Sequence, residues 1–201
     1  MLYLLDTSLA SPKVTNDARA IQPTLVVDPV SVVPLLDNDG IIYQVNPHRV
    51  VIARDNQWAA PLPDQLTDNL YTRLVNDMPD VYVLNANAHV PGYAYRLTTQ
   101  VDRFEGLYRG VATIAGTWQL FNRRNECVAH RRFEIEIPLH ADGYLELVHS
   151  LSRGWRKIIQ GMATSISSAL AGSAARIHEG RDRYRRDGQP GFLVTKRRNP
   201  G

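Results

Sequence analysis

Glu146 and His149 stand three residues apart in the last helix expected from the sequence, a spacing that brings a carboxylate and an imidazole together. Such a pair can act as an acid/base dyad, but on a helix surface it is a solvated contact. His130 and His140 flank one expected strand, and ten residues separate them too widely to share a ligand sphere. Together with Asp142, these residues define one alternative, a small hydrolase or transferase without a recognisable motif, which alanine substitutions would test.

The other residues that could do chemistry are isolated as well. Asp37 and Asp39 beside Gly40 resemble part of a calcium loop, but the twelve-residue ligand pattern is absent, which favours a turn. Cys127 is the single cysteine, so neither an intrachain disulfide nor a thiolate cluster can form, and a small apolar residue at a strand start is expected. Nucleophile-elbow, phosphate-loop, dinucleotide-binding and zinc-protease motifs are missing. We therefore expect no catalytic residue, no cofactor and no metal.

Hydrophobic periodicity predicts the elements that position these residues. Apolar residues recur every four positions over about 62–78, which predicts a helix with Pro63 in its first turn and Pro79 after its end. Alternating or β-branched segments predict strands, with Pro29 and Pro34 suggesting an edge position or irregular ends for the second of them. Those strands cover residues 1–6, 24–33, 41–45, 48–54 and 80–84, with a loop at 7–23 and a hairpin turn at Asn46-Pro47.

The second half of the chain predicts an antiparallel meander followed by one long helix. Segments 95–101, 111–121 and 133–139 alternate apolar and polar residues, the pattern of a sheet with one wet face. Spacings of three and four then predict a helix over about 143–171. Gly154 and Gly161 lie within it, where they weaken the helix and would permit close packing across the sheet, and Gly172 is a plausible stop.

These elements predict an α+β fold in a single domain, a mostly antiparallel twisted sheet packed against the two helices. Its 201 residues suit one well-buried core. From Arg176 onward the chain has eight basic and three acidic residues, which leaves a nearly neutral body before them. We expect residues 1–172 to form the domain and residues 173–201 a basic, flexible tail. An alternative is that the Arg-rich tail binds nucleic acid or anionic lipid, although a solvated end is commoner and no nucleic acid is expected.

The three tryptophans have different expected roles. Trp118 and Trp155 fall in phase with the apolar faces of a strand and a helix, which predicts core positions. Trp58 precedes a Pro-rich corner, where it either anchors the corner or faces a partner. We expect exposed apolar side chains in two loops to form a partner-binding surface, and these are Leu35, Leu36, Ile41, Tyr43 and Trp58.

Several motifs in one order resemble a known family. They are Tyr3-Leu-Leu-Asp6, Val26-Val-Asp-Pro-Val30, Gly40-Ile-Ile-Tyr-Gln44, Asn56-Gln-Trp-Ala-Ala-Pro-Leu62, Gly110-Val-Ala-Thr-Ile-Ala-Gly-Thr-Trp118 and Asp142-Gly-Tyr144. In this order and spacing, residues 3 to 170 resemble the ABC-transport auxiliary lipoproteins of the PqiC type. The most specific elements are the Gln-Trp-Ala-x-Pro-Leu corner and the Gly-x-Trp strand.

The resemblance implies a periplasmic adaptor, not an enzyme, that is lipid-anchored to the outer membrane. It implies partnership with a lipid-transport system built on MCE-domain proteins, and assembly as a homo-oligomer. The family's anchor is a lipidated N-terminal Cys after a signal peptide, and no Cys precedes Cys127. Residues 1–6 lack a basic region and no stretch reaches about 20 apolar residues, so we expect any export segment and anchor to precede this chain.

Overall fold

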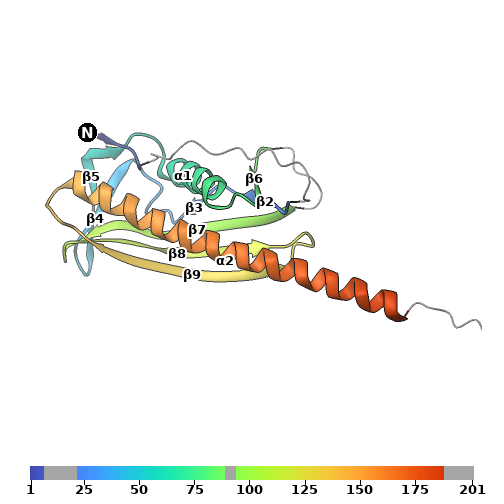
Figure 1. Ribbon diagram of the computed structural model, residues 1–201. Coiled ribbons are helices and arrows are strands. Elements are labelled where there is room, and N and C mark those ends of the chain that lie inside the picture. The colour runs from blue at the N-terminus through green and yellow to red at the C-terminus, as the bar shows by residue number, and fades with distance from the viewer. Residues whose placement is uncertain (7–21, 89–93, 188–201) are drawn as a thin grey trace, which may run out of the picture.

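The computed structural model describes residues 1–6, 22–88 and 94–187, with side chains up to residue 171. Within these residues, nine strands form one mixed sheet, and two helices lie across one of its faces (Figure 1). The elements are β1 (Leu2–Tyr3), β2 (Thr24–Val27), β3 (Ser31–Val32), β4 (Gly40–Asn46), β5 (Arg49–Trp58), α1 (Leu62–Asp77), β6 (Tyr82–Asn85), β7 (Ala94–Leu107), β8 (Val111–Phe121), β9 (Cys127–Pro138) and α2 (Tyr144–Asp187). This architecture confirms the predicted α+β fold.

Strand β7 is the centre of the sheet because its 14 residues serve several neighbours. One edge pairs antiparallel with β8, which in turn pairs antiparallel with β9, as the predicted meander requires. The other edge pairs in succession with the parallel strands β2, β3 and β4. The hairpin of β4 and β5 is also antiparallel, and β1 adds to β5 in parallel.

The predicted edge position of the segment 24–33 is wrong. Its first half, β2, lies between β7 and β6 and is parallel to both. Pro29 falls in the break between β2 and β3, where its missing N–H interrupts no ladder. Pro29 therefore divides the segment into two short strands, and Pro34 follows the second of them.

Helix α1 forms as its leucine stripe predicts. Leu62, Leu66, Leu70, Leu74 and the flanking Met78 are all buried, and the helix ends before Pro79. The helix packs beside α2 and against β6. Burial of one apolar stripe against two neighbours is what stabilises a helix of this length.

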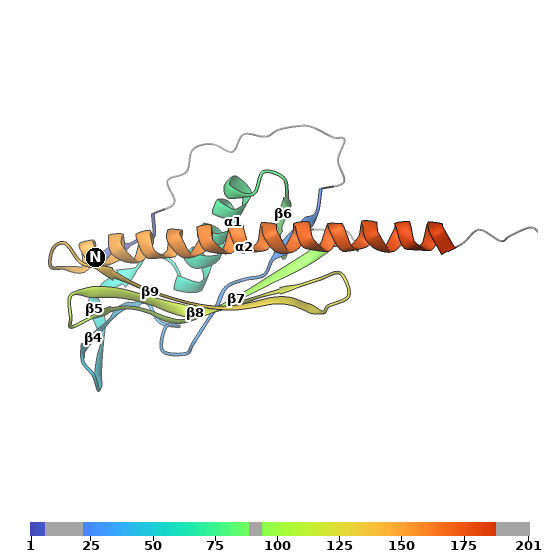
Figure 2. The same cartoon turned by 60° about the horizontal axis from the view of Figure 1, so that its bottom comes forward.

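Helix α2 runs along the sheet over β8 and β9 and continues past its end (Figures 1 and 2). Trp155 is buried on its sheet-facing side, and Trp118 on β8 is buried too, which confirms both predicted core positions. A Cβ on Gly154 would lie 2.8 Å from Cδ1 of Ile114, so this glycine allows the predicted close packing. Gly161 is different, because nothing lies within 4 Å of its Cβ position.

The predicted stop of this helix at Gly172 is wrong, because α2 continues to Asp187. Residues 7–21 of the predicted loop and residues 188–201 of the predicted tail lie outside the described residues. The division of the chain at residue 172 therefore stays a prediction. In the described part of the chain, neither helix combines the length and the apolar character needed to cross a membrane.

Candidate functional site

No hydrogen bond or ion pair joins Glu146 to His149, so the acid/base dyad, the alternative to a solvated contact, does not form. The Glu146 carboxylate instead accepts hydrogen bonds from the His140 backbone N–H at 3.3 Å and the Ser150 hydroxyl at 3.0 Å. Arg153 completes the arrangement with an ion pair at 3.1 Å. The His140 N–H, with smaller contributions from Ser150 and Arg153, holds the pKa of Glu146 below its usual value. This carboxylate thus fixes the loop before α2 to the first turns of the helix.

The remaining chemical candidates are also engaged in local structure. Asn38 bridges the turn that contains Asp37 and Asp39, since its side chain donates to Leu35 O and accepts from Gly40 N. The Cys127 thiol is exposed at the start of β9. Across the described residues, no group of His, Cys, Asp or Glu is arranged to hold a metal ion.

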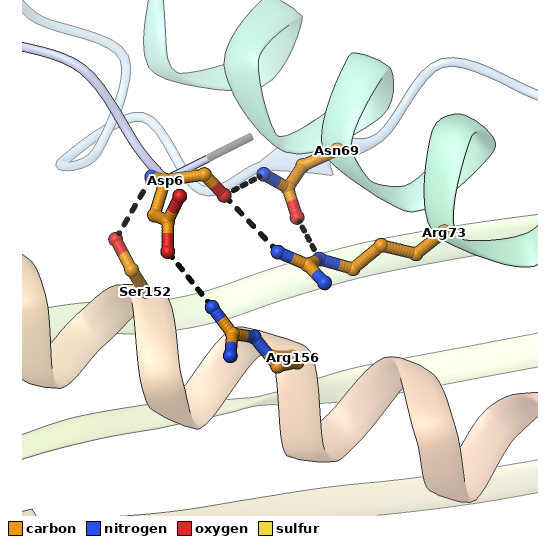
Figure 3. A network of polar contacts seen from close by, with 5 residues as sticks. All are labelled: Asp6, Asn69, Arg73, Ser152 and Arg156. Atoms are coloured by element: carbon orange, nitrogen blue, oxygen red, sulfur yellow. Dashed lines mark hydrogen bonds and ion pairs between the residues drawn. The ribbon is translucent and has the colours of Figure 1, made fainter. Parts of the chain in front are cut away.

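A partly buried polar network surrounds Asp6 (Figure 3). Asn69 and Arg73 of α1 donate to the Asp6 carbonyl at 2.8 and 3.2 Å, and Arg156 of α2 pairs with the carboxylate at 2.8 Å. Ser152 accepts from the Asp6 backbone N–H. Burial, and next the nearby Arg156 charge, lower the pKa of Arg73, whose side chain is nonetheless held by carbonyl oxygens. The network therefore fastens the N-terminal segment to both helices.

Three of the five predicted partner-binding residues are part of the core, so their predicted exposure is wrong. Leu36, Ile41 and Trp58 are 3%, 0% and 5% exposed. Trp58 ends β5 and packs against Phe104 with ring centroids 6.0 Å apart, which is the corner-anchoring alternative. Ile41 is buried because β4 begins at Gly40 and directs it inward. Leu35 is exposed and Tyr43 half-buried, so both stay available to a partner.

Tyr43 lines an open groove of about 630 Å³. We call it the tyrosine groove. Three segments distant in sequence form it: β4, the turn between β7 and β8, and the loop from β9 into α2. The lining residues are Tyr43, Tyr108, Gly110, Leu139, His140, Ala141, Asp142, Gly143, Tyr144 and Leu147.

Two glycines shape this groove. A Cβ on Gly106 would lie 2.6 Å from Cδ2 of Tyr43 and 2.9 Å from Cδ2 of Leu147, so its absence lets these two side chains meet across β7. Gly143 has φ +107°, a conformation that favours glycine, and turns the chain into α2. Tyr108 and Tyr144 were not predicted as site residues, because nothing local in the sequence brings a turn and a helix start together.

Exposed apolar side chains gather around the groove, at what we call the hairpin end. β1 pairs with β5, β4 pairs with β5, and Gln44 of β4 pairs with Leu107 beside the β7–β8 turn. The hairpin pairings bring the exposed Val45, Val50 and Ile52 to the same end of the sheet as Tyr108, and Leu145 follows Tyr144 of the groove. The exposed Met1, Leu2 and Leu4 belong to the segment that pairs with the other end of β5. The run Val50-Val51-Ile52-Ala53, apolar on both faces of a strand, was the sequence signal for the hairpin's part of this surface.

Comparison with known proteins agrees with the predicted resemblance. The model of the family described as ABC-type transport auxiliary lipoprotein component matches residues 3–163. The intermembrane transport lipoprotein PqiC of Escherichia coli is 32% identical over 142 residues, which cover 71% of this chain and 74% of the relative.

Solved structures share the fold. A crystal structure of an uncharacterized protein superposes with a TM-score of 0.71 at 29% identity, covering 82% of this chain and 97% of the other. A Xanthomonas campestris protein also superposes with a TM-score of 0.71, at 19% identity, covering 87% and 99% of the two chains. The second likeness extends the fold to a more distant sequence.

Proposed function

Because the chain belongs to the family of ABC-type transport auxiliary lipoprotein components, we propose that it is a non-enzymatic adaptor of an intermembrane lipid-transport system. In this proposal it works in the periplasm and links an MCE-domain transport protein to the outer membrane, as a homo-oligomer. The ion pairs and hydrogen bonds of Asp6 and Glu146 support a role without catalysis, since these groups brace loops and helices. Of the residues of the catalytic alternative, His140 and Asp142 line the groove.

The observation that carries the proposal is the tyrosine groove within the exposed apolar surface of the hairpin end. Tyrosine side chains in a partly desolvated hollow are typical anchors of protein–protein interfaces. The groove walls come from β4, the β7–β8 turn, the loop before α2 and the first turns of α2. Glu146 fixes that loop to the helix, so the hollow exists before a partner binds. A preformed surface loses little conformational freedom on association.

The role of Leu35 and Tyr43 as partner contacts belongs to this proposal. Tyr43 is held in the groove across Gly106, while Leu35 lies in the turn that precedes β4. Leu36, Ile41 and Trp58 would support the surface from beneath, since their side chains are in the core.

Retention on the cognate MCE-domain protein tests the adaptor role. Tyr108 and Tyr82 are matched tyrosines, 47% and 55% exposed, but Tyr82 lies on β6, away from the groove. We expect Tyr108→Ser to weaken binding at least about tenfold, the effect of losing an interface anchor. Tyr82→Ser is the control and is expected to bind like the wild type.

Two results would count against the adaptor role. One is a wild-type chain that is monomeric and shows no affinity for the MCE-domain protein. The other is an equal loss of binding in Tyr108→Ser and Tyr82→Ser, which would mean that the MCE-domain protein does not bind at the groove. Size-exclusion chromatography with light scattering gives the oligomeric state in the same preparations.

A further inference from the structure

The tip of the β4–β5 hairpin is a two-stranded ribbon that extends away from the helices, beyond the rest of the sheet (Figure 2). β4 pairs with β7 only at Tyr43 and Gln44, and β1 reaches β5 only at its far end, at Gln57 and Trp58. Every residue from Val45 to Val50 is exposed. Two-stranded ribbons are marginal in water, so an exposed apolar one needs an explanation.

Aliphatic side chains on this ribbon are open to solvent. Val50 and Ile52 are 42% and 46% exposed. Because they are two residues apart on β5, their side chains leave the same face of the ribbon. Val45 on β4 is exposed as well. The tip therefore presents aliphatic groups that the fold itself does not cover.

From Gly40 to Arg54 the ribbon carries charge of one sign, and Asp55 on β5 is the first carboxylate beyond it. Residues 40–54 contain Arg49, Arg54 and His48 and no Asp or Glu. Neither arginine forms an ion pair with any described residue, unlike Arg96, which pairs with Asp28 on the body of the sheet. Arg54 continues the row of Val50 and Ile52 along the strand. The ribbon thus combines aliphatic groups with unpaired cations.

We propose that the tip of the β4–β5 hairpin docks onto an anionic lipid surface. Aliphatic side chains enter the boundary between headgroups and acyl chains, while arginines bind the lipid phosphates. The absence of carboxylates over residues 40–54 gives this surface the charge complementarity that an anionic bilayer requires. The inference goes beyond the adaptor role and uses residues that do not line the tyrosine groove.

Co-sedimentation with lipid vesicles tests the inference in the full chain. Vesicles of phosphatidylethanolamine with phosphatidylglycerol are compared with vesicles of phosphatidylcholine alone. We expect the wild type to bind the anionic vesicles more tightly, and high salt to weaken that binding. The double variant Arg49→Gln/Arg54→Gln is expected to lose about thirtyfold in affinity for them, from roughly fivefold per surface arginine.

The aliphatic part of the surface has its own variants and controls. Val50→Ser/Ile52→Ser is expected to weaken binding to anionic vesicles at least about tenfold. Val128→Ser changes an exposed valine on β9, and Arg131→Gln/Arg132→Gln removes two exposed arginines of the same strand. These controls are expected to bind like the wild type. The basic residues beyond Arg176 are present in every variant, so differences between variants report the hairpin alone.

Several outcomes would overturn the inference. They are a wild type that does not bind anionic vesicles, hairpin and control variants that bind equally, and a self-association that the hairpin variants abolish without any vesicles. The last result would assign the tip to a second copy of the chain. Tyr108→Ser is expected to keep vesicle binding and lose the MCE-domain protein, so the two proposals fail separately.

Insertion can also be observed directly. We expect Ile52→Trp to show a blue-shifted emission change on anionic vesicles, quenched by brominated acyl chains, because the new indole would enter the apolar boundary. The native Trp58, Trp118 and Trp155 are buried and supply a constant background. Emission from Ile52→Trp that vesicles leave unchanged would contradict insertion of the tip.

Discussion

Aliphatic and aromatic residues lie in opposite environments in two regions of this molecule. On the helix-covered face of the sheet they are buried beneath α1 and α2, whereas at the hairpin end they are exposed around an open groove. The sequence makes both regions from the same residue types. The difference teaches that a strand's composition does not decide its burial; what decides it is whether another element lies over that part of the sheet.

The largest expected change in unfolding free energy comes from comparing two isoleucines, one in each region. Ile114 of β8 is fully buried, while Ile52 of β5 is exposed. Ile114→Thr is expected to cost about 2–4 kcal/mol of unfolding free energy, from the lost apolar group and an unpaired buried hydroxyl. Ile52→Thr keeps a β-branched side chain at an exposed site and is expected to change stability by no more than about 0.5 kcal/mol.

Urea unfolding of both isoleucine variants measures these differences. If Ile52→Thr destabilised the chain as much as Ile114→Thr, the hairpin would be part of the cooperative core. Its apolar residues would then serve the fold, and the contrast between the two regions would be lost.

Two glycines of α2 allow a packed position and an open position to be compared within one helix. Gly154→Ala gains helix propensity but places its Cβ 2.8 Å from Ile114 and 3.2 Å from Ile137, so we expect a net loss of about 1 kcal/mol. Gly161→Ala meets nothing within 4 Å and is expected to gain about 1 kcal/mol. Thermal or urea unfolding of the pair checks the opposite signs. Stabilisation by both substitutions would mean that α2 can move away from the sheet at little cost.

Local patterns were enough to predict much of the fold. The leucines of α1 and the alternation of Phe133, Ile135 and Ile137 on β9 each depend on a periodicity that neighbouring residues carry themselves. The meander and the hairpin follow from short turns between such segments. These elements need no information from distant parts of the chain.

What the sequence did not predict depends on distant pairing. The central place of β2 exists because β7 is long enough to accept three parallel strands along one edge. Burial of Leu36, Ile41 and Trp58 follows from the same arrangement. Gly154 and Gly161 look alike in sequence, and only the position of the sheet beneath α2 separates them.

The groove itself was not predicted, for a related reason. Of its lining residues, Tyr43 was expected to contact a partner, while His140 and Asp142 were named only for the catalytic alternative. Tyr43, Tyr108 and Tyr144 come from three segments that the β4–β7 pairing and the return of the chain into α2 bring together. No periodicity joins a strand, a turn and a helix start. A surface whose residues come from turns and loops distant in sequence is therefore harder to predict than a core whose apolar residues repeat at the period of a helix or a strand.

The smallest expected effect is a pH dependence of the groove. Acid should raise amide exchange in the loop that lines the groove before it does so on the helix-covered face. The pKa of Glu146 is lowered in the folded chain, chiefly by the His140 N–H, so its stabilising contribution is present above the unfolded pKa near 4.5. That contribution is lost as the pH falls through the lower folded value. Because Glu146 fixes the loop that lines the groove, we expect faster exchange of the His140 amide hydrogen in acid, after correction for intrinsic exchange. Glu146→Gln should remove this pH dependence. Backbone amides in the core around Trp155 are expected to stay protected in both the wild type and the variant. An equal rise of amide exchange in the groove and the core in acid would show that the two regions unfold together.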